Sequence, residues 1–359
     1  MRVLVALNHP AHYHVFKRLI KKLRLKQNSV LVVIRSKDVL EELLVSDKIP
    51  YKILSKKREK SSGRFTLFLN SLEFTKHFLL MSSYALRFRP HILIGTDMAI
   101  GLVSQLLRSK SIVVNEDDFN ANTSFCKVAY PFATKIVAPN YTEVGRYRAK
   151  KINYNGIQKM TYLNDIEGSR TYLKNLFSIE NNENYVIIRI VSLTAGHDIN
   201  ASSGGISINL LEEIIDILLP KFSVLISSEK GLPSRFDNYL IKGNRQHVHL
   251  LMRYASFFIG DSQSMCAEAG ILGVPFVRFN DFVDKISYLR DLEEVYRLGW
   301  GFTTKQRQMF LQRVKFLVDQ DNMKREWETK RTRLFNDKED LTDILMILIC
   351  HGQWGEHRL

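Results

Sequence analysis

The chain has 359 residues, with 52 Lys or Arg and 37 Asp or Glu, so its formal charge is +15. Hydrophobic residues make up 45% of it, which excludes disorder as the main state and allows more than one core. Only three cysteines are present, without a CxxC pair, which excludes a disulfide framework and indicates a reduced, cytoplasmic setting. A protein this basic has nucleic acid, an anionic membrane surface or a phosphorylated substrate as candidate partners.

The sequence offers no targeting or membrane-spanning signal. It runs from Met1 directly into a strand-like segment, so we expect no signal peptide. No window has about 18 consecutive apolar residues, so no spanning helix is predicted. We therefore expect a cytoplasmic protein whose contact with the inner face of a membrane, if it has one, is peripheral.

Short apolar segments alternate with helical patterns through the first half of the chain. Almost wholly apolar runs are typical of strands covered on both faces, as in a parallel sheet. This alternation predicts a doubly wound α/β domain over residues 1–165. The predicted strands are Arg2–Asn8, Val30–Ile34, Ile49–Leu54, His91–Gly95, Ser111–Asn115 and Lys135–Ala138, and the main helices are Tyr13–Leu25, Lys37–Leu44 and Phe65–Phe88.

A polar, irregular stretch over Asn155–Asn184 predicts the domain junction, after which the alternation resumes. A second α/β domain over 166–336 is expected, with a final apolar helix in 337–359 as a candidate to pack back on the first domain. Together the halves predict two Rossmann-like domains facing across a cleft. The predicted strands are Tyr185–Val191, Ser223–Ser227, Val248–Leu251, Phe257–Gly260 and Pro275–Arg278, and the helices are Ile208–Leu219, Ser264–Leu272, Asp281–Leu298, Thr304–Asp319 and Leu341–Cys350.

The most informative segment is Ile259–Asp281, in which an apolar strand ends in a glycine and leads into a helix rich in small residues. A helix N-terminus presents unpaired N–H groups and a positive dipole end, which suits a diphosphate. Glu268, one turn further on, is placed to accept ribose hydroxyls. The alternative is an ordinary serine-capped turn. The predicted nucleotide- or phosphate-binding residues are Gly260, Asp261, Ser262, Gln263, Ser264 and Glu268.

This segment resembles the donor-binding segment of GT-B proteins, which include nucleotide-sugar glycosyltransferases and UDP-N-acetylglucosamine 2-epimerases. More closely, Gly260–Glu293 is similar to an uncharacterised GT-B-like family classed as a domain of unknown function. Its HPAHxHxF-like start, Gly-x-Asp turn and Gly-to-Tyr-Leu junction are matched by His9–Phe16, Gly95–Asp97 and Gly156–Leu163. The resemblance implies a GT-B fold, a nucleotide-sugar donor, most simply UDP-linked, and no required metal or other cofactor.

Three histidines, His9, His12 and His14, lie just after the first predicted strand. The loop at the carboxyl end of that strand is a usual place for a site in a doubly wound sheet. Histidines there are candidates for a metal site, a general base or a contact to an acceptor phosphate, and helix capping or packing is the alternative. We place His9 and His12 among the catalytic candidates and His14 among the other cleft residues, with no metal.

Three acidic residues also follow predicted strands. Asp97 ends the Gly95-Thr96-Asp97 turn, and Glu116 and Asp117 follow Ser111–Asn115. Asp97 loosely resembles an acid/base Asp of the epimerases, but the flanking epimerase motifs around Glu116 are absent. Helix N-capping is the alternative for Asp97 and Asp117. Asp97 is kept as a catalytic candidate, and Glu116 and Asp117 as cleft residues.

A further cluster follows the first strand of the second half. Arg189 is a candidate to neutralise phosphate, and Ser227 follows the next strand. His197 resembles a histidine near this point in the epimerases, without the neighbouring Arg of that group. A flexible Ser/Gly loop is the alternative for the segment that contains His197.

The basic residues concentrate in two runs, within Lys17–Lys26 and Lys56–Arg64, the second of which precedes an aromatic-rich helix. This pairing predicts contact with anionic lipid, and an acceptor carried on a polyprenyl phosphate would explain it. A solvated helix face is the alternative. No nucleic-acid-binding module is recognisable, so nucleic acid is not an expected partner.

The favoured function is glycosyl transfer from a nucleotide sugar to a lipid-linked or glycan acceptor in cell-envelope or exopolysaccharide synthesis. The first alternative is epimerisation of the sugar on its nucleotide, as in the UDP-N-acetylglucosamine 2-epimerases. The second is a non-catalytic protein that binds anionic lipid or another polyanion.

Overall fold

The computed structural model describes residues 1–36, 39–56, 66–120, 122–164, 166, 168–180, 183–191, 205–229, 231–243, 247–284, 286–321 and 323–352. The chain forms two compact units, here called the N-terminal unit, Met1–Tyr162 with Glu339–Leu359, and the C-terminal unit, Leu163–Lys338. The division thus falls inside the polar stretch at Asn155–Asn184 and again just before the last helix.

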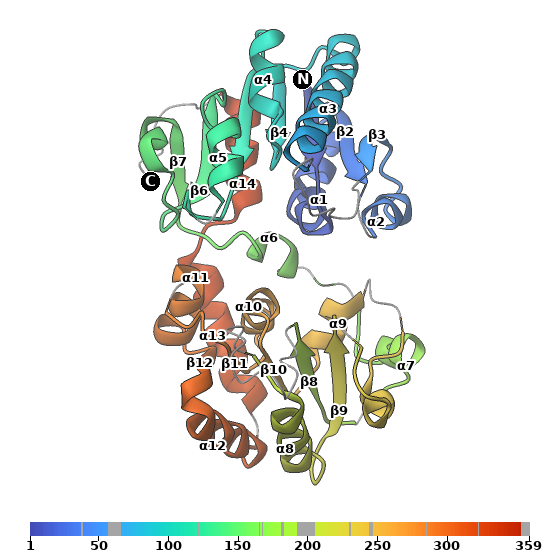
Figure 1. Ribbon diagram of the computed structural model, residues 1–359, viewed down its shortest axis with the longest axis vertical. Helices are drawn as coiled ribbons and strands as arrows, with labels where there is room; N and C mark the ends of the chain where they lie inside the picture. Colours follow the sequence, from blue (N-terminus) through green and yellow to red (C-terminus); the bar gives the residue numbers. More distant parts are fainter. Residues whose placement is uncertain are drawn as a thin grey trace. The chain divides into compact units, whose positions relative to one another are not determined.

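The N-terminal unit is a parallel seven-stranded sheet in the order β3-β2-β1-β4-β5-β6-β7 (Figure 1). Its strands are β1 (Arg2–Leu7), β2 (Ser29–Ser36), β3 (Tyr51–Lys56), β4 (Ile92–Gly95), β5 (Lys110–Val114), β6 (Lys135–Pro139) and β7 (Lys151–Tyr154). Its helices are α1 (Pro10–Leu25), α2 (Leu40–Ser46), α3 (Thr66–Phe88), α4 (Ile100–Leu106), α5 (Thr123–Ala129), α6 (Met160–Leu163, at the boundary) and α14 (Leu341–His351), with a 3-10 turn over Gly145–Lys150.

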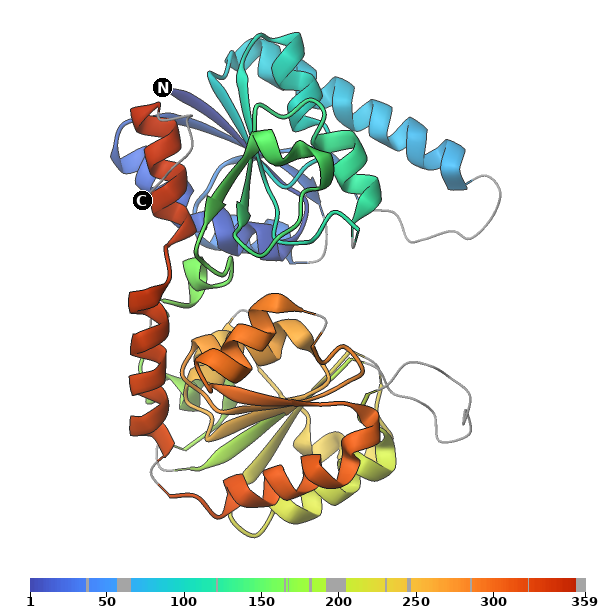
Figure 2. The same cartoon turned by 90° about the vertical axis from the view of Figure 1, so that its left-hand side faces the viewer.

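Both faces of this sheet are covered, as the apolar strands require (Figure 2). Along β1, Val3 and Val5 pack into the core under α1, α2 and α14, whereas Leu4 and Ala6 pack into the core under α3 and α4. The last helix, α14, buries its apolar side chains against α1 in the first of these cores. Chain segments from the two ends of the sequence therefore share one core.

The C-terminal unit is a parallel five-stranded sheet in the order β12-β11-β10-β8-β9. Its strands are β8 (Tyr185–Ile190), β9 (Ser223–Ser228), β10 (Phe257–Gly260), β11 (Phe276–Phe279) and β12 (Gly299–Phe302). Its helices are α7 (Tyr172–Phe177), α8 (Ile208–Leu218), α9 (Val248–Arg253), α10 (Gln263–Ile271), α11 (Ser287–Arg290), α12 (Arg307–Val318) and α13 (Met323–Asp337), with 3-10 turns over Ser234–Tyr239 and Thr304–Gln306 and a π turn over Asp291–Val295.

The predicted α/β class and the two Rossmann-like domains are confirmed, but several element predictions are wrong. The segment from Val248 is helix α9 and not a strand, because a short apolar run does not distinguish a strand from a buried helical turn. Strands β7 and β12 were not predicted. Only two of the four side chains of β7 are buried, and two of the four residues of β12 are glycines. The helix predicted over Asp281–Leu298 is divided into α11 and the π turn.

Candidate functional site

Strand order locates a candidate site in each unit. In the N-terminal unit the order of the sheet reverses between β1 and β4, and in the C-terminal unit it reverses between β8 and β10. Ligands of doubly wound proteins bind beyond the carboxyl ends of strands at such switch points, because the connections there diverge to opposite faces. Asn8 and Asp97 follow β1 and β4, and Val191 and Asp261 follow β8 and β10.

Asp97 is the most constrained residue of the N-terminal site. It is only 1% exposed. Its Oδ2 accepts hydrogen bonds from Asn8 Nδ2 at 2.7 Å and pairs with His77 Nε2 at 2.9 Å, while Oδ1 accepts from the Ala99 N–H at 2.7 Å. Burial raises the pKa of Asp97, but the hydrogen bonds and charge of His77 and the bonds from Asn8 and Ala99 outweigh it, so the pKa is lowered. The carboxylate is thus held ionised.

His77 comes from α3 and joins β3 to the switch point. Its Nδ1 lies 3.3 Å from the hydroxyl of Ser55, and its ring is buried. A lone histidine in an aromatic-rich helix carries no sequence signal for this role, so His77 was not predicted. Close approach of β1 and β4 completes the site, since a Cβ on Gly95 would lie 2.2 Å from the carbonyl oxygen of Ala6.

The predicted histidines surround the start of α1. His9 is its N-cap residue, and His9 Nδ1 accepts the Ala11 N–H at 3.1 Å. His12 Nδ1 accepts a longer hydrogen bond of 3.4 Å from the Asn8 N–H, and the rings of His9 and His12 are 6.0 Å apart. The structure therefore brings His9 and His12 to Asp97 through Asn8. His14 turns instead toward Tyr162, with ring centroids 5.5 Å apart.

Glu116 and Asp117, the acids that follow β5, form no hydrogen bond or ion pair with Asp97 or its partners among the described residues. Glu116 forms an ion pair with Lys159 at 3.2 Å, and both side chains are largely buried. Asp117 is exposed, and its backbone closes a turn with the side chain of Asn115. The side chain of Asp117 does not act as a helix cap in these contacts. Asp97 accepts the N–H of Ala99 in the turn before α4, which begins without a side-chain cap, so the N-capping alternative holds for neither acid.

The C-terminal site is built around the start of α10. Ser262 is the N-cap residue, and its hydroxyl accepts the Met265 N–H. Within the described residues, the N–H groups of Gln263 and Ser264 have no acceptor, and the side chain of Ser264 is exposed. Two open donors at the positive end of a nine-residue helix form a ready position for an anion.

Gly260 and Asp261 hold this turn against the neighbouring strand. A Cβ on Gly260 would lie 2.9 Å from the carbonyl oxygen of Arg189, so the two strands approach as closely as glycine allows. Asp261 Oδ1 accepts the Val191 N–H at 2.7 Å, and the Asp261 carbonyl accepts from Asn280 Nδ2 at 2.9 Å. In these contacts Asp261 positions the turn.

Glu268 faces α9 from within α10. Its Oε2 lies 3.2 Å from His249 Nε2, and both side chains are largely buried. His249 was not predicted, because it lies 19 residues earlier in a segment assigned to a strand. The carboxylate that the sequence places near a ribose is therefore oriented by a histidine.

Arg189 and Ser227 lie at the ends of β8 and β9. Arg189 Nη1 donates to Ser227 Oγ at 2.7 Å, and Nη2 forms an ion pair with Glu229, which is half-exposed. His197 lies outside the described residues, so the structure does not place it. Among the residues that the structure describes, no three His, Cys, Asp or Glu side chains gather as a metal site requires.

A second buried network, not predicted, supports the turn from β11. Arg278 is 1% exposed and donates three hydrogen bonds to Glu293, from Nε at 3.0 Å and from Nη2 at 2.8 and 3.0 Å, and a fourth from Nη1 to Asn280 at 3.2 Å. Burial raises the pKa of Glu293, and the charge of Arg278 opposes that rise only in part. Asn280 links this pair to Asp261, so buried hydrogen bonds hold the turn at the start of α10.

Two Rossmann-like units, each with polar groups at its switch point, define a protein of the GT-B type. The chain belongs to the DUF354 family, described as proteins of unknown function, whose model matches residues 1–350. No curated protein matches it.

Solved structures of two kinds share this fold over nearly the whole chain. A candidate UDP-N-acetylglucosamine 2-epimerase from Listeria monocytogenes is 14% identical, with a TM-score of 0.69, over 99% of this chain and 97% of that one. The UDP-GlcNAc 2-epimerase from Neisseria meningitidis, bound to UDP-GlcNAc, is 14% identical, with a TM-score of 0.63, over 93% of this chain and 99% of that one. The glycosyltransferase VinC, in complex with DTDP, is 11% identical, with a TM-score of 0.61, over 99% of this chain and 100% of that one. At these identities the likeness establishes the fold alone.

Proposed function

We propose that the chain is a nucleotide-sugar-dependent glycosyltransferase whose C-terminal unit binds the diphosphate at the start of α10. The observation that carries this proposal is the pair of open N–H groups of Gln263 and Ser264, at the switch point of the sheet. The neighbouring Ser262 keeps its hydroxyl on the helix as a cap, so the two backbone donors remain for a ligand. Solved structures with this fold include complexes with UDP, UDP-GlcNAc and DTDP, which support a nucleoside diphosphate as the ligand class.

Glu268 is the proposed contact to the ribose. Its Oε2 lies 3.2 Å from His249 Nε2, so the carboxylate is held between the packed helices α9 and α10. A carboxylate held in one orientation is a better acceptor for two neighbouring hydroxyls than a mobile one, because less entropy is lost on binding. UDP is the first nucleotide to test, since it is the nucleotide most often named among the solved relatives.

Transfer to an acceptor is favoured over epimerisation by the state of the acids in the N-terminal unit. Epimerisation through carboxyl groups requires them to exchange protons, whereas Asp97 is buried, fully hydrogen-bonded and held ionised, and Glu116 is paired with Lys159. We assign Asp97 the positioning of Asn8 and the start of α1. Epimerisation stays the alternative, since both acids follow strands at the same edge of the sheet.

The base in this proposal is His12. His9 Nδ1 already accepts a hydrogen bond of 3.1 Å from a backbone N–H, so neutral His9 carries its proton on Nε2 and acts as a donor to the acceptor substrate. His12 Nδ1 accepts only a longer hydrogen bond of 3.4 Å from the Asn8 N–H, so His12 can exchange that bond for the acceptor hydroxyl at a lower cost than His9 can. His12 removes the acceptor hydroxyl proton, the oxygen attacks the anomeric carbon, and the bond to the diphosphate breaks, with the leaving charge held at α10.

The experiment that tests the proposal combines binding with product analysis. Calorimetry with UDP, followed by a panel of UDP-sugars, is expected to show saturable binding to the full chain. The sugar nucleotide is then incubated alone and with lipid-linked or glycan acceptors, and the products are separated by chromatography. Acceptor-dependent release of UDP supports transfer, and conversion of the sugar without acceptor supports epimerisation. Absence of binding by every nucleoside diphosphate and nucleotide sugar would refute the assigned site.

A further inference from the structure

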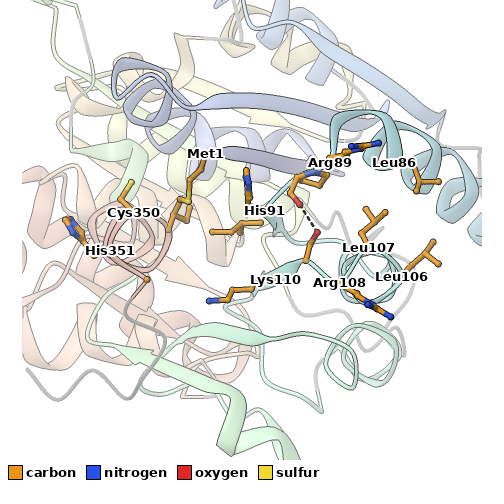
Figure 3. Close-up of a pocket in the computed structure, with 15 residues that line it drawn as sticks. Met1, Leu86, Arg89, His91, Leu106, Leu107, Arg108, Lys110, Cys350 and His351 are labelled. Carbon is orange, nitrogen blue, oxygen red and sulfur yellow. Dashed lines mark hydrogen bonds between the residues drawn. The ribbon is translucent and has the colours of Figure 1, made fainter.

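One face of the N-terminal unit, which extends along α3 to the amino ends of β4 and β5, combines apolar and basic side chains. At the amino ends of β4 and β5 the structure has a hollow of about 960 Å³ (Figure 3). Segments at the ends of α3, α4 and α14 line it. The lining contains no acidic side chain, and its Arg, Lys and His members are Arg89, His91, Arg108, Lys110 and His351.

Exposed leucines adjoin these cations. Leu86 and Leu106 line the hollow and are 55% and 58% exposed, and Figure 3 shows them with Leu107 on one side of it, near Arg89 and Arg108. Leu72 and Leu79, exposed by 52% and 60%, continue the row along α3. Leu72, Leu79 and Leu86 of α3 are spaced by seven residues, which is within about 20° of two full helical turns, so they form one line along the helix.

The opposite side of α3 packs against the sheet, so the leucine row is not needed to hold the helix in place. Phe74, Phe78 and Met81 pack into the core on β1 and β4. Leucines that are more than half exposed, on a helix that already has a buried face, leave apolar surface in water unless something covers them. Spaced protruding leucines, with polar residues between them, are typical of helices that lie in a membrane interface.

The charge of this face is one-sided. Between Glu73 and Glu116 the sequence has five Lys or Arg residues and a single acid, Asp97, which is buried at the other edge of the sheet. Within the described residues, Lys76, Arg87, Arg89 and Arg108 form no ion pair. A protein partner would need an acidic apolar surface of matching shape, whereas an anionic bilayer offers both properties at any position.

The basic run on α1, which the sequence favoured for this role, is partly neutralised. Lys17, Arg18 and Lys22 form ion pairs with Asp47, Asp340 and Asp343. Residues 57–65, which hold most of the second basic run, lie outside the described part of the chain. No helix in the described residues is long and apolar enough to cross a membrane.

We infer that the N-terminal unit docks on an anionic lipid bilayer through this face, with the leucine row of α3 and Leu106 entering the interface and Arg89, Arg108 and Lys110 contacting lipid phosphates. The face is defined by Leu72, Leu79, Leu86, Leu106, Lys76, Arg87, Arg89, Arg108 and Lys110. This inference does not depend on nucleotide binding by the C-terminal unit.

The test is flotation of the full chain with vesicles of phosphatidylcholine, alone or with about one-third phosphatidylglycerol. Binding is expected with the anionic vesicles at about 0.1 M salt and lost at about 1 M salt, where the screening length falls to about 3 Å. Arg108→Gln with Lys110→Gln is expected to lower the partition coefficient by about 25-fold, at about fivefold per cation. Leu79→Ser with Leu86→Ser is expected to lower it by about 10-fold or more, since each leucine loses roughly half of its transfer energy.

Matched controls come from α1. Leu25, which is 75% exposed, is replaced by Ser, and Lys21 and Arg24 are replaced together by Gln; binding should change less than about twofold. Circular dichroism verifies that each variant is folded. Equal binding to neutral vesicles, loss of binding only in the α1 variants, or unchanged binding in both face variants would overturn the inference. So would a dimer in light scattering that Leu79→Ser with Leu86→Ser converts to a monomer, since the face would then bind a second copy.

Discussion

The open donors at the start of α10 lead to a substitution that removes one N–H and little else. Gln263 is the first residue of the helix, where proline is tolerated because its missing N–H has no helical acceptor. The preceding Ser262 has φ −80° and ψ 115°, which is the extended conformation that proline requires of its predecessor. Gln263→Pro should therefore change the free energy of unfolding by less than about 1 kcal/mol.

Binding of UDP should change much more. A hydrogen bond to a charged group contributes about 1.5–3 kcal/mol, so loss of the Gln263 N–H to a diphosphate oxygen predicts an affinity about 10- to 150-fold weaker. Titration calorimetry of UDP against the full chain measures the effect, and urea unfolding verifies stability.

Gln263→Ala is the matched control for this substitution. It removes the same side chain and keeps the backbone N–H, so its affinity for UDP should stay within about twofold of the original chain. If Gln263→Pro binds UDP as tightly as Gln263→Ala, the backbone of α10 does not hold the diphosphate and the assigned site is wrong.

Three further predictions concern buried groups. Asp97→Asn should destabilise the N-terminal unit by about 3–5 kcal/mol near pH 7, because it removes one partner of a buried pair. Because folding lowers the pKa of Asp97, its contribution to stability is complete above the unfolded pKa of about 4 and is lost as the pH falls through the folded pKa. The urea midpoints of the original chain and of Asp97→Asn should therefore approach each other at low pH, and midpoints that stay equally far apart below about pH 3 would contradict this. Arg278→Met should cost about 3–5 kcal/mol in the C-terminal unit by leaving Glu293 unpaired, and Arg278→Met with Glu293→Leu should recover much of that loss in the same unfolding assay. Gly260→Ala should weaken UDP binding in calorimetry, because its Cβ displaces the end of β10 from β8.

The two units can be followed separately in these assays. Trp300 and Trp327 lie in the C-terminal unit, and their rings are 5.9 Å apart. The remaining tryptophan of the sequence, Trp354, lies outside the described residues. In a Trp354→Phe background, tryptophan fluorescence therefore reports the C-terminal unit. Hydrogen exchange of peptides from β1 and β4 reports the N-terminal unit, where Asp97→Asn is expected to act alone.

Local patterns were sufficient for most of the elements and for the turn that begins α10. The segment from Gly260 to Glu268 was recognisable because its features are neighbours in sequence: a strand-ending glycine, a capping serine and a helix of small residues. The same locality explains the errors. Val248–Arg253 and Gly299–Phe302 are too short for their periodicity to show whether they are helix or strand, and only packing decides it.

The sequence by itself determined the α/β class, the two Rossmann-like domains and the glycine-serine turn, because alternating apolar runs and helix starts are encoded over a few residues. The tertiary structure alone decided strand order, and with it the two switch points. It also paired His77 with Asp97, His249 with Glu268 and Arg278 with Glu293, which are 20, 19 and 15 residues apart. Such pairs form only where separate strands and helices end beside one another, and no local pattern specifies that. The charge of +15 was visible at once, but only the contacts of the described residues distinguished the α1 cations that are neutralised in ion pairs from Lys76, Arg87, Arg89 and Arg108, which form no ion pair there.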